Sequence, residues 1–439
     1  MAKPLVNQPR VPTPNPPAVS RRIFYGWWVV VGGMASSTVT GIFRQYGTGA
    51  FFRRLVEDLG TTRTALSGAL SLSQLETGLL GPLEGVLIDN LGPRLVMAIG
   101  SVIFGVGFMA LAFVHSVPAF YVVFLVMALG SSLASYLPMV ACLNNWFVRK
   151  RALALGIAMT GSSIGGILVP GLAWSIISFG WRHTAFGAGL IVIAAGLPIA
   201  LLMRRRPEDY GLLPDGATTP GVESSPKEAR GSGAREVTGL TAAQAVRTPA
   251  FWLINASQSL ALMITGAVSV HQIAAFEDMG LSLQMAATVV SVSTTVGIVG
   301  RLGGGVLGDR WDKRLALACV YAMESVGIFI LANVRTLGMA LLYAVTFGLA
   351  DGARGPLVVA LRGDYFGRRS FATIMGLGGL IITAGTAWGP VLAGYMYDLR
   401  RSYTLAFVAM ASVNLLGPVM IMLAKKPSVR SHSLSGEAR

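Results

Sequence analysis

The sequence predicts an all-α membrane protein in which twelve transmembrane helices form two parallel six-helix bundles. Three observations lead to this prediction: long apolar runs, a repeat shared by the two halves, and basic residues at alternate run ends. Of the 439 residues, 53% are hydrophobic and 13% are charged, whereas about 25% of residues are charged in a typical soluble domain. The apolar runs exceed the roughly 18 residues that mark a membrane-spanning helix. A β-barrel is excluded because the runs are continuously apolar, without a period of two.

The apolar runs define the expected spans and the expected domains. The spans cover residues 23–48, 66–88, 95–115, 118–146, 152–178, 183–203, 249–276, 284–307, 315–334, 337–362, 371–397 and 402–424. A stretch rich in Pro, Gly, Ser and charge separates the sixth span from the seventh and is typical of a polar linker. We therefore expect a disordered N-terminal tail (1–22), a first bundle (23–203), a linker (204–248), a second bundle (249–424) and a C-terminal tail (425–439).

The distribution of basic residues predicts the orientation. Lys and Arg are concentrated at one set of run ends, around residues 21–22, 94, 149–151, 204–206, 310–314, 368–369 and 425–426. Basic residues favour the cytoplasmic side, so we expect both termini and the linker there, in a multi-pass protein of the inner (plasma) membrane. The same distribution accounts for the net charge of +15. The lipid bilayer, and not nucleic acid, is therefore the expected partner.

The two halves of the chain contain an internal repeat. The segment GVLIDNLGPR at 85–94 matches GVLGDRWDKR at 305–314, an offset of 220 residues. The segment WFVRKRALALG at 146–156 resembles YFGRRSFATIMG at 365–376, and G-x-x-x-G pairs recur at 161/165 and 385/389. Each pair occupies corresponding places in the two halves, so the halves run in the same sense, as in one large class of transporters.

The repeated loop segment carries paired carboxylates that could form a gate. The candidate gating residues are Gly85, Asp89, Gly92 and Arg94 in the first copy and Gly305, Asp309, Arg310, Lys313 and Arg314 in the second. A carboxylate at a helix end can bridge to Arg on a neighbouring helix, and glycines allow the close approach. Such a latch could hold the bundles together in one state and release them in another. The alternative is that the charges only fix topology, to which acidic residues contribute little.

At these residues the chain resembles the major facilitator superfamily. Its loop motif, Gly-x-x-x-Asp-Arg-x-Gly-Arg-Arg, is present in the first copy except at Asn90 and Pro93, and the second copy has Asp312 where Gly is expected. A finer resemblance, to the oxalate/formate antiporter and monocarboxylate transporter branches, rests on YGWWVV at 25–30, NWFVRKRALALGIA at 145–158, RPEDYGLLPDG at 206–216 and GRLGGGVLGDR at 300–310. The resemblance implies secondary transport of a small organic anion (a mono- or dicarboxylate) by alternating access, and a monomer suffices.

Ionisable residues inside the spans are candidate functional residues, because each costs about 2.5–3.5 kcal/mol to insert at mid-membrane. Arg301 precedes Asp309 by eight residues, which is about 12 Å along a helix. It shares its helical face with Thr294 and Gly297, so we expect this face to line protein or a cavity. Its guanidinium could hold a carboxylate bidentately, and the resemblance implies a substrate role for an Arg in the eighth span. The alternative is a structural Arg paired with a carboxylate.

Asp351 and Arg354 are three residues apart and can pair on one face of a helix. In one interpretation the pair only lowers the cost of inserting both charges. In the other, a substrate anion that binds Arg354 would leave Asp351 without its partner and favour proton uptake. The sequence leaves both interpretations open.

Five further residues complete the candidate site. Arg44 in the first span, His271 in the seventh and Trp388 in the eleventh are possible substrate contacts. Glu76 and Glu324 are possible proton-coupling residues, and Glu76 is also a possible partner for Arg44. His271 lies near a helix end, where an isolated His is often an interfacial or packing residue. Glu76 and Glu324 could equally be structural.

No sequence pattern indicates an enzyme, a metal site or a cofactor. A Walker sequence is absent, which argues against an ATP-driven pump, and the four His residues lack metal-ligand spacing. The leading function is therefore transport of a small organic anion, coupled to a proton or to a counter-anion. The alternatives are an exporter of drugs or other metabolites on the same fold, and a membrane sensor that has lost transport.

Overall fold

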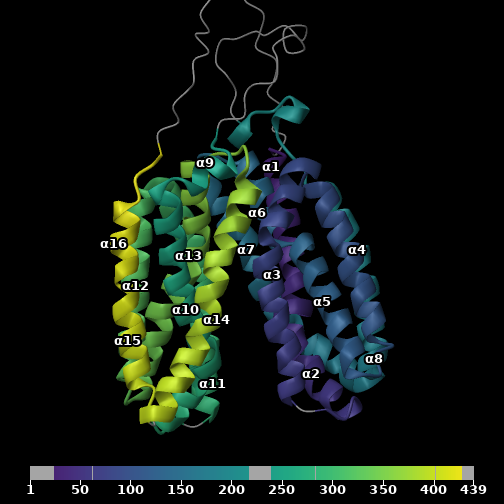
Figure 1. Ribbon diagram of the computed structural model, residues 1–439, viewed down its shortest axis with the longest axis vertical. Helices are drawn as coiled ribbons and strands as arrows, with labels where there is room; N and C mark the ends of the chain where they lie inside the picture. The colour runs from purple at the N-terminus through teal and green to yellow at the C-terminus, as the bar shows by residue number, and fades with distance from the viewer. Residues whose placement is uncertain (1–23, 62, 217–238, 282, 401, 428–439) are drawn as a thin grey trace, which may run out of the picture.

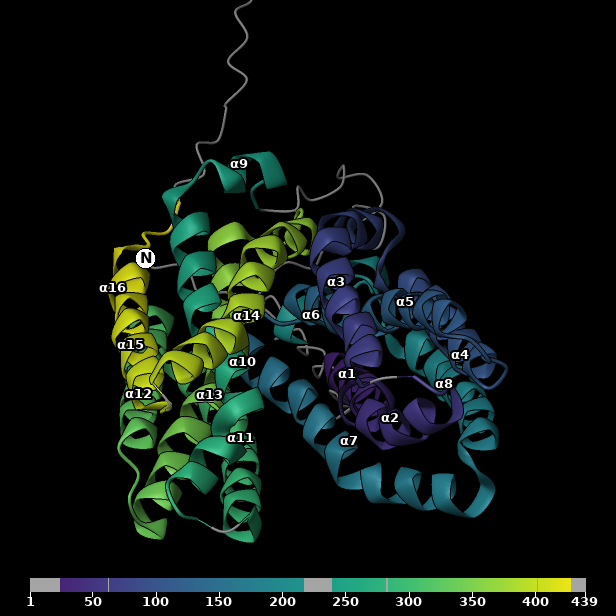
Figure 2. The same cartoon turned by 60° about the horizontal axis from the view of Figure 1, so that its bottom comes forward.

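The structure is a computed structural model that describes residues 24–427 except 62, 217–238, 282 and 401. The described residues are almost entirely helical, and they contain no β-strand. Figures 1 and 2 show two groups of long helices side by side, with the short elements of the linker across one end. We call this end the linker face and the opposite end the open face, because the two groups diverge towards it (Figure 1).

The first group contains nine helical elements. They are α1 (Gly26–Thr40), the π-helix η1 (Gly41–Tyr46), α2 (Gly47–Asp58), α3 (Arg63–Leu91), α4 (Pro93–Leu111), α5 (Val117–Ala134), α6 (Tyr136–Trp146), α7 (Arg151–Phe179) and α8 (Trp181–Leu202). The linker contributes η2 (Glu208–Tyr210), η3 (Pro214–Gly216) and α9 (Ala242–Val246). The second group contains α10 (Pro249–Asp278), α11 (Leu283–Arg310), α12 (Lys313–Ala332), α13 (Leu337–Phe366), α14 (Phe371–Arg400), α15 (Thr404–Asn414) and α16 (Leu416–Leu423).

Ten of the described helices or helix pairs are long and apolar enough to cross a membrane. They comprise α4, α5 with α6, α7, α8, α10, α11, α12, α13, α14, and α15 with α16. The α1–η1–α2 run and α3 are two further long helical segments. The prediction of an all-α membrane protein is confirmed, whereas the count of twelve spans stays a prediction.

A break between α5 and α6 has a local cause. Pro138 has no N–H to donate to the carbonyl of Ala134 four residues earlier, so the helix cannot continue through this turn. At the break, Ser135 has φ −135° and ψ −91°. The carbonyl oxygen of Ala134 accepts a hydrogen bond from Ser36 Oγ at 2.9 Å instead. The break therefore leaves this buried acceptor satisfied.

The buried apolar residues show where the two groups are joined. One cluster draws residues from both groups and includes Trp146 and Phe366 near the linker face. A second cluster lies within α10–α15, and a third lies within η1–α8. The two groups thus share one hydrophobic core towards the linker face and have separate cores elsewhere.

Two helix crossings bring the groups together, and the sequence repeat relates one crossing to the other. On α3, a Cβ added at Gly81 would lie 3.1 Å from the carbonyl oxygen of Gly376 on α14. On α7, a Cβ added at Gly156 would lie 2.6 Å from the carbonyl oxygen of Arg301 on α11. Gly81 and Arg301 are 220 residues apart, as are Gly156 and Gly376, so the two crossings are equivalent under the repeat. Both crossings require a residue without a side chain.

This geometry predicts a difference between two glycines of α14. In Gly376→Val the new side chain would meet the backbone of Gly81, whereas a Cβ at Gly379 would meet nothing within 4 Å. Overpacking typically costs about 1–3 kcal/mol, so Gly376→Val should melt at a lower temperature than Gly379→Val. Both variants lose the same flexibility on replacing Gly, so Gly379→Val is the control. Equal melting temperatures in detergent, measured by scanning fluorimetry, would contradict the close crossing.

Candidate functional site

A cavity of about 880 Å³ lies between the two groups of helices. Its walls come from α1 and η1, α3, α5 and α6 in the first group and from α10, α13 and α14 in the second. The polar lining consists of Thr40, Arg44, Gln45, Ser73, Gln74, Thr77, Glu84, Ser131, Ser132, Ser135, Tyr136, Gln258, Arg362 and Thr383. We call it the central cavity. Its lining is polar on several sides, with two Arg and one Glu among the described residues.

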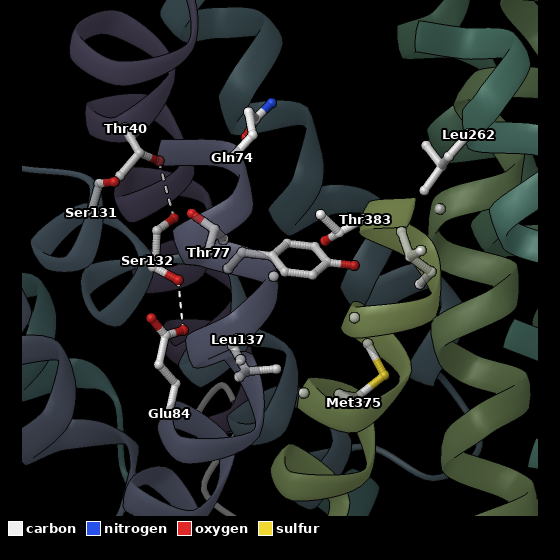
Figure 3. A pocket seen from close by; sticks show the side chains of 18 of the residues that line it. Thr40, Gln74, Thr77, Glu84, Ser131, Ser132, Leu137, Leu262, Met375 and Thr383 are labelled. Atoms are coloured by element: carbon white, nitrogen blue, oxygen red, sulfur yellow. Dashed lines mark hydrogen bonds between the residues drawn. The ribbon is translucent and has the colours of Figure 1, made fainter. Parts of the chain in front are cut away.

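Figure 3 shows how the two walls differ. On the first-group wall, Ser132 and Glu84 are joined by a hydrogen bond, and Thr77 lies nearby. On the facing wall, Thr383 and Met375 come from α14 (Figure 3). The first-group wall therefore supplies most of the hydroxyl groups, and the facing wall supplies a more apolar surface.

Arg44 enters the cavity from the π-helix η1. Its Nε donates to Ser131 Oγ at 3.2 Å and its Nη2 donates to Ser73 Oγ at 3.3 Å. Its guanidinium also lies 5.5 Å from the ring centre of Phe124, within the range of a cation–π contact. Glu76 on α3 is near enough for its charge to interact with that of Arg44. The structure thus brings together two residues that the sequence suggested as partners.

Arg362 enters the cavity from α13, one turn before that helix ends. Its Nη2 donates to Asn255 Oδ1 at 2.7 Å and its Nη1 lies 3.4 Å from Met375 Sδ. The side chain is 3% exposed, and its Nε has no hydrogen-bond partner. None of the ion pairs among the described residues involves Arg362. It is therefore a buried cation whose neighbours are neutral.

Glu84 lines the same cavity from α3 and is 3% exposed. Its Oε2 accepts a hydrogen bond from Ser132 Oγ at 2.6 Å, and its Oε1 has no partner among the described residues. Neither Glu84 nor Arg362 was a candidate in the sequence. Glu84 directly precedes the Gly85 motif, and Arg362 is the last residue of the expected tenth span. Both could be taken for charges at a helix end, although each is buried.

The predicted pair Asp351 and Arg354 belongs to a cluster beside the cavity. Arg354 Nη2 donates to Asp351 Oδ1 at 2.5 Å, and Arg354 Nε lies 3.5 Å from Glu324 Oε2 on α12. Thr265 on α10 also donates to Asp351 Oδ1 at 3.2 Å. Glu324, which has no evident partner in the sequence, therefore shares one guanidinium with Asp351. Neither acid nor Arg354 lines the central cavity, and their proposed part in coupling stays a prediction.

His271 and Trp388 also lie outside the lining of the central cavity. The ring of His271 connects three helices, because its Nδ1 is 3.2 Å from Tyr403 Oη and its Nε2 is 3.0 Å from the carbonyl oxygen of Pro390. Trp388 is 59% exposed. It is five residues beyond Thr383, which places it roughly 140° around α14 from that cavity-lining side chain. The structure thus gives His271 a packing contact and turns Trp388 away from the lining.

Arg301 lies where α11 crosses α7, and it does not line the central cavity. Its Nη1 donates to Ser163 Oγ on α7. The small residues around it pack against helices: Gly304 lies against Ala353 on α13, and Gly305 lies against Ala152 on α7. The sequence placed this face against protein or a cavity, and the structure places it against protein. Of the two expected surroundings, protein is therefore the one observed, and the role of Arg301 in binding substrate stays a prediction.

At the linker face, two carboxylates reach across to the opposite group of helices. Asp89 at the end of α3 accepts hydrogen bonds from the backbone N–H groups of residues 372 and 373, at 3.4 and 3.0 Å, in α14. Asp309 at the end of α11 accepts from the N–H groups of residues 152 and 153, both at 2.9 Å, in α7. The first N–H groups of a helix have no acceptor within the helix. Each Asp therefore caps a helix of the other group, and the two caps are equivalent under the repeat.

The other gating candidates divide into two sets. A Cβ at Gly85 would lie 2.5 Å from the carbonyl oxygen of Ala372, and one at Gly305 would lie 2.9 Å from that of Ala152, so both glycines permit the caps. Gly92 has φ 86° at the start of α4. The basic residues do not bind the two Asp side chains: Arg94 and Arg310 are exposed, and Arg314 donates to the carbonyl oxygen of Met422. Backbone amides thus take the place of the expected Arg partners.

Ion pairs reinforce the linker face. Asp364 on α13 accepts from Arg151 Nη1 at 2.5 Å and lies 2.9 Å from Lys313 Nζ. In the linker, Glu208 forms a two-point pair with Arg368, at 2.7 and 2.9 Å. Asp215 accepts from the N–H groups of residues 148–150 at 2.8–3.2 Å. The linker therefore binds the loops that precede both α7 and α14.

The Asp309 cap predicts a change in the spacing of the linker face. Asp309→Ala would remove the acceptor of two N–H groups, and an unmade buried hydrogen bond costs about 1–3 kcal/mol. Spin labels on the exposed Arg94→Cys and Lys425→Cys positions, with Cys142 and Cys319 replaced by Ser, should move apart in Asp309→Ala. The matched control is Asp312→Ala, because Asp312 caps its own helix with a bond of 2.7 Å to Arg314 N. Unchanged electron-resonance distances in Asp309→Ala would contradict the cap.

The Glu208–Arg368 pair predicts a weak dependence of stability on pH. Burial raises the pKa of Glu208, but the hydrogen bonds and charge of Arg368 outweigh it, so the pKa lies below its ordinary value. The stabilisation is therefore present above the ordinary pKa and is lost as pH falls through the lowered one. Because Glu208 is 36% exposed, we expect at most about 1 kcal/mol. Melting temperatures of wild type and Glu208→Gln should begin to converge as the pH falls below the ordinary glutamate pKa of 4.5; a constant difference would contradict this.

Comparison with known proteins agrees with this architecture. The sequence model of the Major Facilitator Superfamily matches residues 29–353 and, separately, 277–439. Monocarboxylate transporter 13 of Rattus norvegicus is 27% identical over 401 residues, which cover 90% of this chain and 87% of the relative. Several other relatives are also monocarboxylate transporters, so the resemblance to that branch is confirmed.

Solved structures show the same fold. The proton:xylose symporter XylE superposes with a TM-score of 0.70 at 13% identity, covering 92% of this chain and 96% of that one. The human organic anion transporter MFSD10 superposes with a TM-score of 0.66 at 14% identity, covering 90% of this chain and 98% of that one. The family and its relatives are membrane transporters, not enzymes. This multi-pass membrane protein belongs to the Major Facilitator Superfamily.

Proposed function

We propose that this chain carries a small organic anion, a carboxylate, through the central cavity by alternating access. Residues 23–203 and 249–424 would be the two moving bundles, joined by the linker 204–248. The linker face would be cytoplasmic, and the described state would face outward. The observation that carries the proposal is the buried guanidinium of Arg362, which lines the cavity without an acidic partner among the described residues.

The charges around the cavity support an anionic substrate. Arg44 interacts with Glu76, and Arg354 shares its charge with Asp351 and Glu324. Among the described residues, Arg362 is bound by the neutral side chains of Asn255 and Met375 alone. A buried cation is costly unless an anion pairs with it. A carboxylate from the substrate would supply that anion, and the planar guanidinium can bind it with two hydrogen bonds.

The size of the cavity and its surroundings support the same substrate class. A volume of about 880 Å³ lies within the usual range for small-molecule sites. Hydroxyl groups from Ser73, Ser131, Ser132 and Thr383 could bind the oxygens of a hydroxy or keto acid. The monocarboxylate transporters among the relatives favour the carboxylate class over cationic or amphipathic compounds.

The two ends of the cavity support alternating access. Towards the linker face the bundles share one hydrophobic core and are joined by the Asp89 and Asp309 caps. Towards the open face their hydrophobic cores are separate. Exchange of these contacts between the two faces would expose the same cavity to the other side of the membrane.

The proposal predicts that Arg362→Gln strongly lowers carboxylate uptake. Loss of charged hydrogen bonds of about 1.5–3 kcal/mol should weaken substrate binding by about 10- to 100-fold. Uptake of labelled lactate, pyruvate, oxalate and formate into proteoliposomes, with and without a pH gradient, would measure it. The matched control is Arg335→Gln, an exposed Arg between α12 and α13. Competition by carboxylates but not by amines is expected; competition by amines alone would overturn the anion assignment.

A further inference from the structure

We infer that Glu84 is the proton-binding group of the central cavity, so that one proton is carried with each monoanion. This inference rests on the proposed anion transport and identifies the residue that couples it to protons. It differs from the sequence predictions, which placed proton coupling on Asp351, Glu76 and Glu324. The inference depends on three features of Glu84: its burial, its lack of a cationic partner, and its place in the cavity wall.

The surroundings of Glu84 favour the neutral acid. The Glu84 side chain is 3% exposed, one of its oxygens accepts a hydrogen bond from Ser132, and the other has no partner in the part of the chain that the structure describes. No described Lys or Arg forms an ion pair with it. Burying an ionised carboxylate with one hydroxyl donor costs far more than burying the protonated acid. Glu84 is therefore stable here as the acid and would need a change in its surroundings to release the proton.

The other carboxyl groups within the helices have cations beside them. Glu76 interacts with Arg44, while Asp351 and Glu324 share Arg354. Glu324 is also 0% exposed and does not line the cavity, so a proton has no open path to it in this state. Glu84 combines the two properties that a proton carrier needs, namely the absence of a fixed cation and a place in the wall of the cavity.

Comparison of the ionisable groups around the cavity identifies Glu84 as the proton acceptor. The ionisable groups on the surrounding elements are Glu76 on α3 itself, Arg44 on η1, Tyr136 on α6 and Arg362 on α13. The cavity linings from α5 and α14, which include Ser132, Met375 and Thr383, contain no titratable group among the described residues. Apart from Glu76, which is close to Arg44, the nearby ionisable groups are a phenol and two guanidinium groups.

The position of Glu84 along α3 connects its protonation to the opening of the linker face. It lies on α3 between Gly81, which crosses Gly376, and Gly85, which contacts Ala372. Asp89 follows one turn later and caps α14. Because Glu84 is at this crossing, separation of α3 from α14 would open the same carboxyl group to the linker face. The proton would thus be taken up from one side and released to the other.

Charge balance explains why proton and anion would move together. With Glu84 ionised and the site empty, its charge offsets that of Arg362. With Glu84 protonated, the charge of Arg362 is offset by a bound monoanion. Both states that cross the membrane therefore have the same charge, and transport is electroneutral with one proton per anion. An anion bound beside ionised Glu84 would leave an uncompensated negative charge, which low dielectric makes costly.

The experiment compares net uptake with exchange in proteoliposomes. In wild type, an inward proton gradient should drive up to about tenfold accumulation of lactate per pH unit, since a one-unit gradient is worth about 1.4 kcal/mol per proton. Glu84→Gln, which mimics the protonated acid, should keep lactate–lactate exchange and lose this accumulation. Glu84→Asp should retain accumulation with a displaced pH profile, and Glu324→Gln should retain it. Proton-driven accumulation in Glu84→Gln would overturn the inference.

A second measurement separates this inference from the proposed function. Infrared difference spectra of the purified protein between neutral and acidic pH should show the C=O band of a protonated carboxylic acid that is absent in Glu84→Gln, whether or not substrate is present. An unchanged band pattern in Glu84→Gln would overturn the assignment. If wild type transports no carboxylate, the proposed function fails even though the band is seen. If it does and Glu84→Gln remains proton-driven, only the present inference fails.

Discussion

Two hydrogen-bonded caps determine the state in which this transporter is observed. The first N–H groups of α7 and α14 lack acceptors within their own helices, and Asp309 and Asp89 from the opposite bundle supply them. A carboxylate at a helix N-terminus is favoured both by charge-assisted hydrogen bonds and by the helix dipole. Opening of the linker face would therefore require both caps to break. The caps join the two groups at the linker face, while the groups diverge towards the open face.

The repeat makes the two caps alike, but the surrounding ion pairs differ. Asp364 binds Arg151 and Lys313 beside one cap. The repeat places Asn144 or Asn145 at the corresponding position of the first half, so that half has no such carboxylate. The linker supplies one instead, because Glu208 pairs with Arg368 beside the other cap. The linker is thus part of the closed face as well as a connection between bundles.

Two charged residues of the cavity, Arg362 and Glu84, lie near its closed end. Arg362 lies two residues before Asp364, and Glu84 lies five residues before Asp89, so each of these two cavity residues shares a helix end with a carboxylate that joins the bundles at the linker face. Rigid helices would transmit the movement of the gate directly to these groups. Inside the membrane an unpaired charge is costly, which makes Arg362 and Glu84 sensitive to an arriving anion and proton. In the proposed mechanism, site and gate would be coupled through the shared ends of α3 and α13.

The sequence by itself determined the elements that follow from period, length and repetition: apolar helices, the polar linker, the repeat and the family. It also predicted the two equivalent carboxylates Asp89 and Asp309, which recur at one spacing, whereas their gating role stays a prediction. It did not determine which buried charges face the cavity. Arg301 lies at the helix crossing equivalent to Gly81 and therefore packs against α7, whereas Arg362 and Glu84 resemble charges at span ends and are buried. Only tertiary structure decided this, because the direction of a side chain depends on how distant helices cross.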